Sequence, residues 1–405
     1  MNRIDEMIRL YDFKEVKRVK LKDCCSAIYS GGTPLTSQEQ YYDGNIPWIR
    51  SGEIDFNRIS QSERNITKEG LANSSAKMIR PKSVVMAMTG ATVAKVATIE
   101  AEISANQSVC AMEPNDLLHY RFLYFYLAAN YHKLKNSAQG ALTSLNLQRI
   151  KDLEIPLPPL AIQQEIVSVL DSFTSLIEKM KEEVALRKKQ MEYYCDKFFG
   201  ENLDGMKALA KIPGNSVVRI SELGTITRGK RFVREDIREA GQPCIHYGDM
   251  YTYYGTKART TRTFLYADFP KKMRYAHKGD VVIVGAGEND YDIGVGLVWM
   301  GEEPVAVHDA CYILEHEQVP MYISYYLRSN IYHQQLKQYV SSGKISSFSA
   351  EGLGKVLIPI PPLAQQHRIA STLDLFESYI TKLERLIELR QKQYEYYRDK
   401  LLAFE

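Results

Sequence analysis

The sequence has no run of about twenty uncharged apolar residues, so it offers no candidate for a transmembrane helix. Its first twenty residues carry charges throughout and lack the apolar core of a secretory signal peptide. The six cysteines form no CxxC pair and no spacing typical of a disulfide framework. We therefore expect a cytoplasmic protein with reduced and mostly buried thiols.

Neither sign of charge is in large excess. The 52 basic and 49 acidic side chains give a net charge of +3, which excludes a uniformly basic coat for nucleic acid but not a local basic surface. The chain is 45% hydrophobic and 25% charged, which is ordinary for a globular protein and too apolar for a disordered one. Its 405 residues are enough for more than one domain.

Catalytic motifs are missing as well. Residues 224–231 (GTITRGKR) match the start of a phosphate-binding P-loop, but Arg231 stands where such a loop has Ser or Thr for Mg²⁺. The eight histidines show no metal-ligand spacing, and no arrangement typical of a nucleophilic triad stands out. We therefore expect a binding protein without a catalytic or metal site. A nucleotide-dependent enzyme that uses this loop is the less favoured alternative.

An internal repeat is the clearest feature that is present. Residues 155–200 and 358–403 align without a gap at an offset of 203, with 24 identities in 46 positions. A weaker match lies upstream, where residues 125–127 (FYL) resemble residues 325–327 (YYL). The chain therefore consists of two copies of one unit, a globular part followed by a long helix. We expect the divisions 1–154, 155–200, 201–357 and 358–405.

The repeated segments have the pattern of coiled-coil helices. Pro158-Pro159 and Pro361-Pro362 mark the two helix starts, because proline fits only the first turn of a helix. Apolar residues then recur in alternating steps of four and three for more than four heptads. In the first copy they run from Ile166 to Phe198, and in the second from Ile369 to Leu401. Two such helices in one chain most simply pair with each other.

One position of this apolar seam is an arginine in each copy, Arg187 and Arg390. One interpretation is that the adjacent Leu186 and Leu389 fill the seam while the arginines point outward. The other is that the arginines stay in the seam and fix the register of the two helices.

Both globular parts favour a mixed α/β (α+β) fold. Short β-rich runs alternate with turn residues, for example at 83–88 and 94–99 in the first part, and an aromatic helical stretch follows. In the second part, residues 228–278 hold twelve basic and five acidic residues, with tyrosines between them. Such a segment is suited to contacts with phosphates and bases, although a solvated charged loop would have the same composition.

Taken together, these motifs resemble the specificity subunits of type I restriction-modification systems. The resemblance rests on the Pro-Pro-Leu start of each helix with its glutamines, and on the QxEYYxDK ends at 190–197 and 393–400. Motifs of the globular parts also support the resemblance: GGTP at 31–34, IPWI at 46–49, NQS at 106–108 and YGD at 247–249. The second part departs from the pattern, with Gly229-Lys230-Arg231 in place of Gly-Thr-Pro.

The resemblance implies two target-recognition domains, each reading one half of a bipartite, asymmetric DNA site. The two helices would pair antiparallel, set the gap between the half-sites and dock two methyltransferase subunits, and restriction subunits would join for cleavage. S-adenosylmethionine, ATP and Mg²⁺ would belong to those partners, and this chain would be non-catalytic with no cofactor of its own. A coiled-coil scaffold without sequence-specific DNA binding is the alternative.

The candidate DNA-binding residues come from the motifs and the local charge. In the first domain they are Lys17, Thr33, Arg50, Arg64 and Lys68. In the second domain they are Arg228, Lys230, Arg231, Arg234, Tyr251, Tyr253, Lys257, Arg259 and Arg262. Lysine and arginine supply affinity through phosphates, whereas arginine forks and polar groups can read base edges.

Overall fold

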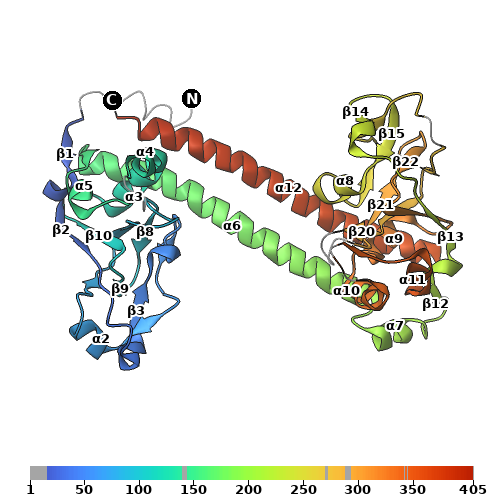
Figure 1. Cartoon of the computed structure of the whole chain (residues 1–405), viewed down its shortest axis with the longest axis horizontal. Coiled ribbons are helices and arrows are strands. Elements are labelled where there is room, and N and C mark those ends of the chain that lie inside the picture. The colour runs from blue at the N-terminus through green and yellow to red at the C-terminus, as the bar shows by residue number, and fades with distance from the viewer. Residues whose placement is uncertain are drawn as a thin grey trace. The chain divides into compact units, whose positions relative to one another are not determined.

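The computed structural model describes residues 16–138, 144–269, 272–287, 293–341, 343 and 345–404. They form two compact units (Figure 1). The first unit runs up to Met180 and includes the residues from Leu386 on, and the second is Lys181–Arg385. The domain divisions expected from the sequence follow the repeat along the chain, whereas the compact units divide both long helices, because packing joins segments from opposite ends of the sequence.

The first domain is built on a five-stranded sheet in the order β2-β10-β7-β8-β4, with helix α3 against β7 and β8 (Figure 1). These elements are β2 (Cys25–Ser30), β10 (Val109–Pro114), β7 (Val84–Ala87), β8 (Val96–Ile99), β4 (Arg58–Ile59) and α3 (Tyr120–Ala129). Every residue of β7 and β8 is buried, because alternate side chains face two different cores. One core contains the aromatic side of α3, and the other leads toward a second, smaller sheet.

The smaller sheet has the order β5-β3-β9-β6 and lies at the end of the domain away from α6 (Figure 1). Its strands are β5 (Asn65–Ile66), β3 (Tyr42–Ile49), β9 (Ile103–Ala105) and β6 (Met78–Ile79), and α2 (Lys68–Ala72) follows β5. Strands β3 and β9 run parallel, with Ile49 opposite Ala105. Their carboxyl ends therefore open into neighbouring loops.

The second domain repeats this plan with larger loops. Its two sheets have the orders β13-β23-β19-β21-β16 and β14-β17-β15-β22-β18. The strands of the first are β13 (Gly224–Arg228), β23 (Cys311–His316), β19 (Val281–Val284), β21 (Gly296–Trp299) and β16 (Lys257–Ala258). Those of the second are β14 (Ile237–Arg238), β17 (Thr263–Leu265), β15 (Gln242–Ile245), β22 (Val305–Val307) and β18 (Tyr275–Ala276). The parallel pair β15 and β22 corresponds to β3 and β9. The expected mixed α+β fold and the repeat are confirmed.

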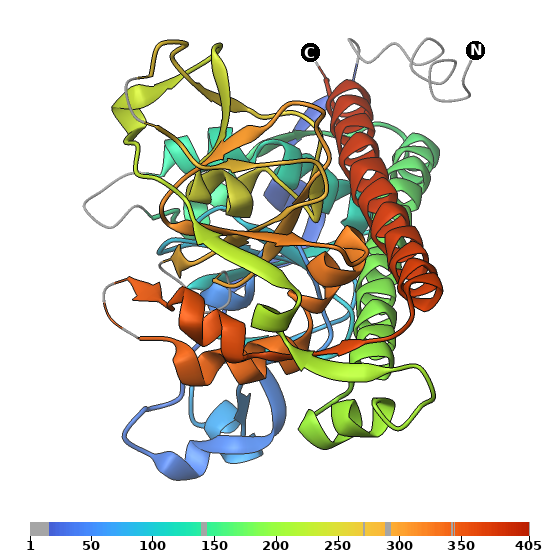
Figure 2. The same ribbon diagram turned by 90° about the vertical axis from the view of Figure 1, so that its right-hand side faces the viewer.

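Shorter elements complete each domain. In the first they are β1 (Arg18–Lys20), β11 (Glu154–Pro156), α4 (Tyr131–Ser137) and α5 (Leu147–Lys151). In the second they are α7 (Leu203–Leu209), β12 (Ser216–Arg219), α8 (Tyr247–Thr252), β20 (Ala286–Gly287), α9 (Pro320–Tyr326), α10 (Asn330–Leu336), β24 (Ser346–Ser347), α11 (Ala350–Lys355) and β25 (Leu357–Ile360). Figure 2 shows β25 running into the last long helix, with β12 paired alongside it.

The long helices α6 (Leu160–Phe199) and α12 (Leu363–Leu401) begin directly after the two proline pairs, as the sequence predicts. One buried glutamine ties each helix start to its domain. Gln163 accepts the N–H of His119 (2.8 Å) and donates to the carbonyls of Leu117 and Pro158. Gln366 likewise accepts the N–H of Val319 (3.1 Å) and donates to Pro361 O (2.8 Å). This contact accounts for a glutamine at the same place in both repeats.

Replacing Gln366 by alanine is expected to lower the free energy of unfolding by about 1–3 kcal/mol, because the buried Val319 N–H and Pro361 carbonyl lose their partner. Denaturant unfolding of the purified chain measures this change. The adjacent Gln365 is exposed, so Gln365→Ala is a matched control that should leave stability unchanged. Equal effects of the two substitutions would contradict the assignment.

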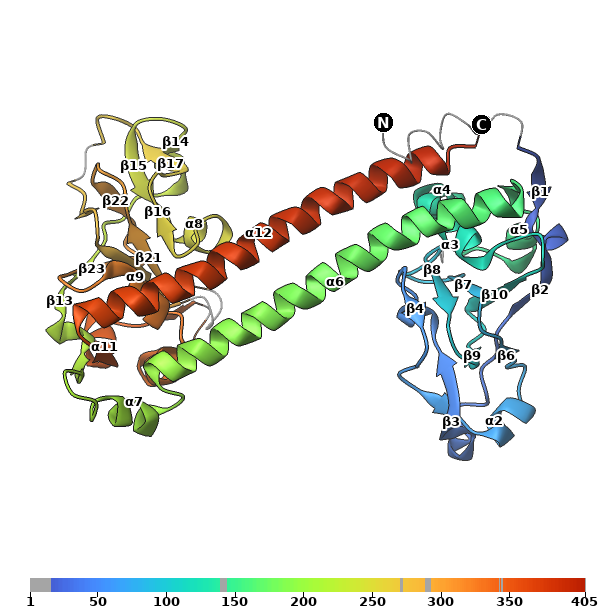
Figure 3. The ribbon, with the colours of Figure 1, turned by 180° about the vertical axis from the view of Figure 1, so that it is seen from behind.

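The two long helices pair antiparallel in each unit (Figure 3). In the second unit, Lys188 pairs with Glu384 (2.8 Å) and Tyr194 packs on Phe376 (5.4 Å between ring centroids), so the numbering runs in opposite directions. In the first unit, Phe173 stacks on Tyr397 at 5.8 Å. Most seam positions expected from the heptads are buried or half-buried, which confirms the coiled coil. None of the helices in the described ranges is long and apolar enough to cross a membrane.

The structure around the two seam arginines contradicts the first of the two interpretations. Leu186 and Leu389 are 61% and 48% exposed, so the prediction that they fill the seam is wrong. A residue next to a seam position is rotated by about 100° around the helix, which carries its side chain out of the seam. Arg187 is half-buried, with its guanidinium 5.5 Å from the Tyr379 ring centroid and bonded to Glu183 and Gln190. Arg390 bonds Gln393 in the same way, and a role of the pair in register stays a prediction.

Candidate nucleic-acid interface

Three loops of the first domain meet where β2, β3 and β9 end. We call residues 31–34, 50–53 and 106–108 the first junction. Backbone hydrogen bonds join the loops: Gly31 N–H to Val109 O (3.0 Å), Gly32 N–H to Ala105 O (2.9 Å) and Asn106 N–H to Ile49 O (2.9 Å). A Cβ atom on Gly31 would lie 2.2 Å from Ala105 O, so only glycine allows this close approach. This packing accounts for the glycines of the GGTP motif.

The second domain builds the same structure from residues 229–232, 246–248 and 308–310, which we call the second junction. The equivalent hydrogen bonds run from Gly229 N–H to Cys311 O (2.9 Å), from Lys230 N–H to Val307 O (2.9 Å) and from His308 N–H to Ile245 O (3.1 Å). These bonds and the parallel strand pairs align the two junctions residue by residue. Thr33 corresponds to Arg231, Arg50 to His246, and Asn106 to His308.

At the first junction the polar side chains largely pair with one another. The Thr33 hydroxyl bonds the side chain of Gln107. Arg50 is exposed and lies between two carboxylates, 3.7 Å from Glu53 and 2.5 Å from Glu63. The Arg64 carbonyl accepts the N–H of Trp48 (3.0 Å) on β3, which places Arg64 near Arg50, and its side chain is exposed. Lys68 is also exposed, at the start of α2. Four of the five candidates in this domain therefore lie at the junction or next to the adjoining smaller sheet.

Basic side chains gather at and just after the second junction. Lys230 and Arg231 of the junction and the nearby Arg234 are exposed, and none of them makes an ion pair with another residue in the described ranges. The Arg228 Nε donates to the carbonyl of Asp309 (2.7 Å). Arg274 bonds the carbonyl of Arg228. Sequence reasoning did not select Arg274, although it lies in the basic segment, because nothing in the segment indicates which loop it contacts.

Two imidazoles lie at the centre of the second junction. The rings of His246 and His308 are 4.7 Å apart, and Phe232 packs edge-on against His308 at 4.8 Å. Both nitrogens of His308 are bonded, Nδ1 to the N–H of Ala310 (3.1 Å) and Nε2 to the carbonyl of Phe232 (3.1 Å). Burial lowers the pKa of His308, and the neighbouring His246 ring acts in the same direction. His308 is therefore a neutral group that holds the three loops together.

Aromatic candidates lie on and after α8. Tyr253 is 57% exposed, and the Arg262 guanidinium lies 5.4 Å from its ring centroid. The backbone N–H of Arg262 donates to the hydroxyl of Tyr254 (3.0 Å). Burial raises the pKa of Tyr254 to about 12. Arg259 is exposed after β16. Tyr251 belongs to α8, but its side chain lies outside the described residues.

The other two candidates lie away from the junctions. Lys257 on β16 forms an ion pair of 2.9 Å with Asp374 of α12. Lys17 is exposed before β1, and its carbonyl accepts the N–H of Leu157 (3.0 Å) where β11 leads into α6. Both therefore belong to the side of their domain that carries the long helix.

The Lys257 contact belongs to a repeated clamp that sequence reasoning missed. In the first unit, Asp171 of α6 binds Arg58 (3.2 Å) and the buried Arg121. In the second, Asp374 binds Lys257 and accepts from the hydroxyl of Tyr325 (2.8 Å). Asp171 and Asp374 are 203 residues apart, so an aspartate at the same place in both repeats was the signal for this contact.

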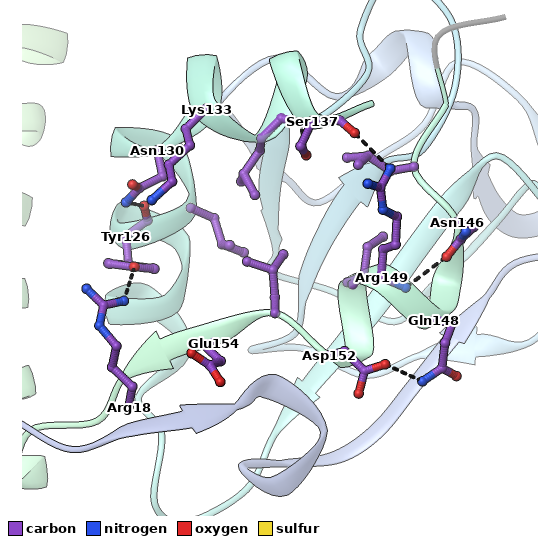
Figure 4. A pocket seen from close by; sticks show the side chains of 15 residues that line it. Arg18, Tyr126, Asn130, Lys133, Ser137, Asn146, Gln148, Arg149, Asp152 and Glu154 are labelled. Carbon is purple, nitrogen blue, oxygen red and sulfur yellow. Dashed lines mark hydrogen bonds between the residues drawn. The ribbon is translucent and has the colours of Figure 1, made fainter. Parts of the chain in front are cut away.

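A cavity of about 460 Å³ opens in the first domain between α4, α5 and the β1/β11 pair (Figure 4). Its polar lining residues mostly bond one another: Arg18 to Tyr126 (3.4 Å), Arg149 to Ser137 O (2.8 Å) and Gln148 to Asp152 (2.6 Å). None of its lining residues belongs to the first junction. In the part of the chain that the structure describes, no three His, Cys, Asp or Glu side chains gather in a way that could hold a metal ion.

Comparison with known proteins gives consistent matches. The family described as the type I restriction modification DNA specificity domain matches residues 14–186 and 214–391. A putative type I restriction enzyme specificity subunit of Haemophilus influenzae is 27% identical over 98% of this chain and 97% of its own length. The crystal structure of a type I system S subunit from M. genitalium has a TM-score of 0.60 at 16% identity, covering 97% of this chain and 98% of that one. A second solved structure, described as the structural basis of complex assembly and conformational transition of the type I R-M system, has a TM-score of 0.57 at 19% identity. The match covers 98% of this chain and 100% of that one.

Proposed function

The chain belongs to the type I restriction-modification DNA specificity family, and we propose that each of its two junctions reads one half of a bipartite DNA site. The observation that carries this proposal is that one three-loop structure occurs twice on the same backbone plan. Each junction gathers loops with exposed polar and basic side chains, which is what contact with phosphates and base edges requires. The two copies then account for two half-sites.

The two half-sites differ in this proposal, because equivalent positions carry different chemistry. Thr33 in one junction corresponds to Arg231 in the other, and Arg50 to His246. Glu53 and Glu63 balance Arg50 in the first junction, whereas the second junction exposes Lys230 and Arg231, with Arg234 just after them, and none of these three has an ion-pair partner among the described residues. Affinity for the second half-site should therefore depend more on phosphate contacts and on salt.

We also propose that the long helices set the gap between the half-sites and dock two methyltransferase subunits, with restriction subunits joining for cleavage. Each helix is continuous, and the 40 residues of α6 correspond to a length of about 60 Å. Apolar side chains stay exposed on the helices of each unit, as expected of a face that a partner covers. They are Leu186, Leu375 and Tyr379 in the second unit, and Leu176, Leu389 and Tyr396 in the first.

In this proposal the chain is a non-catalytic cytoplasmic subunit. S-adenosylmethionine, ATP and Mg²⁺ bind to the partner subunits, and this chain recognises the target sequence. The alternative, a coiled-coil scaffold without a DNA role, would show only weak duplex binding without sequence dependence.

Replacing Arg231 by alanine is expected to weaken DNA binding by the assembled complex and to reduce its salt dependence. Loss of one phosphate contact changes the slope of log K against log salt by about 0.9. Titration of a cognate duplex at several salt concentrations measures both quantities.

Lys257→Ala is the control, because Asp374 already pairs with that ammonium group. It should leave the salt slope unchanged. A slope that responds to Lys257 and not to Arg231 would overturn the placement of DNA at the junction.

A further inference from the structure

One position differs between the junctions in a way that bears on base recognition. Arg50 follows Ile49 at the end of β3, and His246 follows Ile245 at the end of β15. Ile49 and Ile245 each accept one N–H, from Asn106 and from His308 respectively. Arg50 and His246 therefore occupy the same place in the two domains.

The hydrogen bonds of His246 define which of its nitrogens can donate. Its Nδ1 accepts the N–H of Gly248 (3.2 Å), so the proton of the neutral ring is on Nε2. Among the described residues no acceptor takes this Nε2–H. The ring is held by Tyr247 at 4.5 Å and by His308 at 4.7 Å, and it is half-buried. His246 is therefore a fixed single donor at the surface of the junction.

The surroundings keep this donor neutral. Burial lowers the pKa of His246, Arg234 acts in the same direction, and Asp249 opposes them. The other charged groups near the pair are Arg231 and Asp309, both beside His308. At neutral pH the ring offers one N–H, and the exposed arginines around it are placed to take phosphates.

Arg50 offers different chemistry at the same place. Its guanidinium presents a fork of donors, and Glu53 and Glu63 hold it from two sides. A fork matches two acceptors on one base, as on the major-groove edge of guanine, whereas a single N–H matches one acceptor. Arg50 and His246 therefore differ in the pattern of base acceptors that they can bind, and not in charge alone.

Building on the proposed function, we propose that position 50/246 determines specificity and that His246 Nε2–H reads one base-edge acceptor in the second half-site. Arg50 makes the corresponding forked contact in the first half-site. His308 acts as a positioning residue, because both of its nitrogens are used within the junction.

The test is to express the full chain with its cognate methyltransferase subunit in an unmethylated host and to map methylated sites across the genome. Wild type, His246→Arg and His246→Gln are compared. Arg is the side chain of the first junction, and the amide NH2 of Gln places a neutral N–H donor near the place of Nε2. The first half-site serves as an internal control in every map.

His246→Arg is expected to change the preferred base at one or two positions of the second half-site by at least tenfold, with the first half-site unchanged. His246→Gln should retain the wild-type motif at reduced efficiency. An unchanged second half-site in His246→Arg would overturn the proposal, as would an even loss of methylation at all sites. If wild type itself shows no bipartite motif, the proposed function fails instead, so the two failures are distinguishable. If His246→Arg does not fold, a changed motif in His246→Gln would overturn the proposal by itself.

Discussion

Deleting one matched heptad from each long helix is expected to shorten the gap between the two half-sites by about three base pairs. Seven helical residues span about 10 Å. Successive base pairs rise about 3.4 Å along the axis of the DNA helix. Residues 180–186 and 384–390 form a suitable pair of deletions, because their removal keeps the heptad phase on both helices. The contacts Phe173–Tyr397 and Tyr194–Phe376 then keep the same register.

The gap is measured by mapping methylated sites made by the shortened chain together with its methyltransferase subunit. Deleting the heptad from α12 alone is the matched control, and it should abolish activity because the Phe173–Tyr397 and Tyr194–Phe376 contacts can then no longer form together. An unchanged gap with full activity in the doubly shortened chain would refute the idea that the helices set the spacing.

Replacing Asp171 by alanine is expected to destabilise the first unit by about 3–5 kcal/mol, because it leaves the buried Arg121 guanidinium without its counter-ion. The Arg121 side chain is only 5% exposed, and it lies over the rings of Tyr124 and Phe125. These aromatic contacts do not replace a carboxylate. Denaturant unfolding of the purified chain measures the loss.

The control for this clamp is Arg58→Ala. Arg58 also binds Asp171, but its side chain is 45% exposed, so its loss should cost no more than about 1 kcal/mol. The double change Asp171→Leu with Arg121→Met should recover most of the stability, because it removes both buried charges. Equal stabilities of Asp171→Ala and Arg58→Ala would show that the clamp does not fasten the helix to the domain.

Local signals in the sequence were enough to predict the long helices and the repeat. The proline pairs mark the helix starts, and the heptads define the seam, since both are properties of neighbouring residues. The candidates Thr33, Arg50, Arg228, Lys230 and Arg231 also came from contiguous motifs or charge, and they lie at or beside the junctions.

Contacts between distant segments could not be predicted. Lys257 was selected for its charge, but it pairs with a carboxylate 117 residues away on α12. The contacts of Arg187 with the Tyr379 ring and with Glu183 depended on how a long side chain packs beside the seam, which the heptad pattern does not give. The match between Arg50 and His246 likewise required the strand pairs β3/β9 and β15/β22.

In the proposed function, one chain reads two different half-sites at a fixed distance. Genome-wide mapping of methylated bases tests it most directly, after co-expression of this chain with its cognate methyltransferase subunit in an unmethylated host. We expect a single split motif with two unlike halves and one gap length. A complex that assembles but methylates no motif, or one that methylates a continuous motif, would contradict the account.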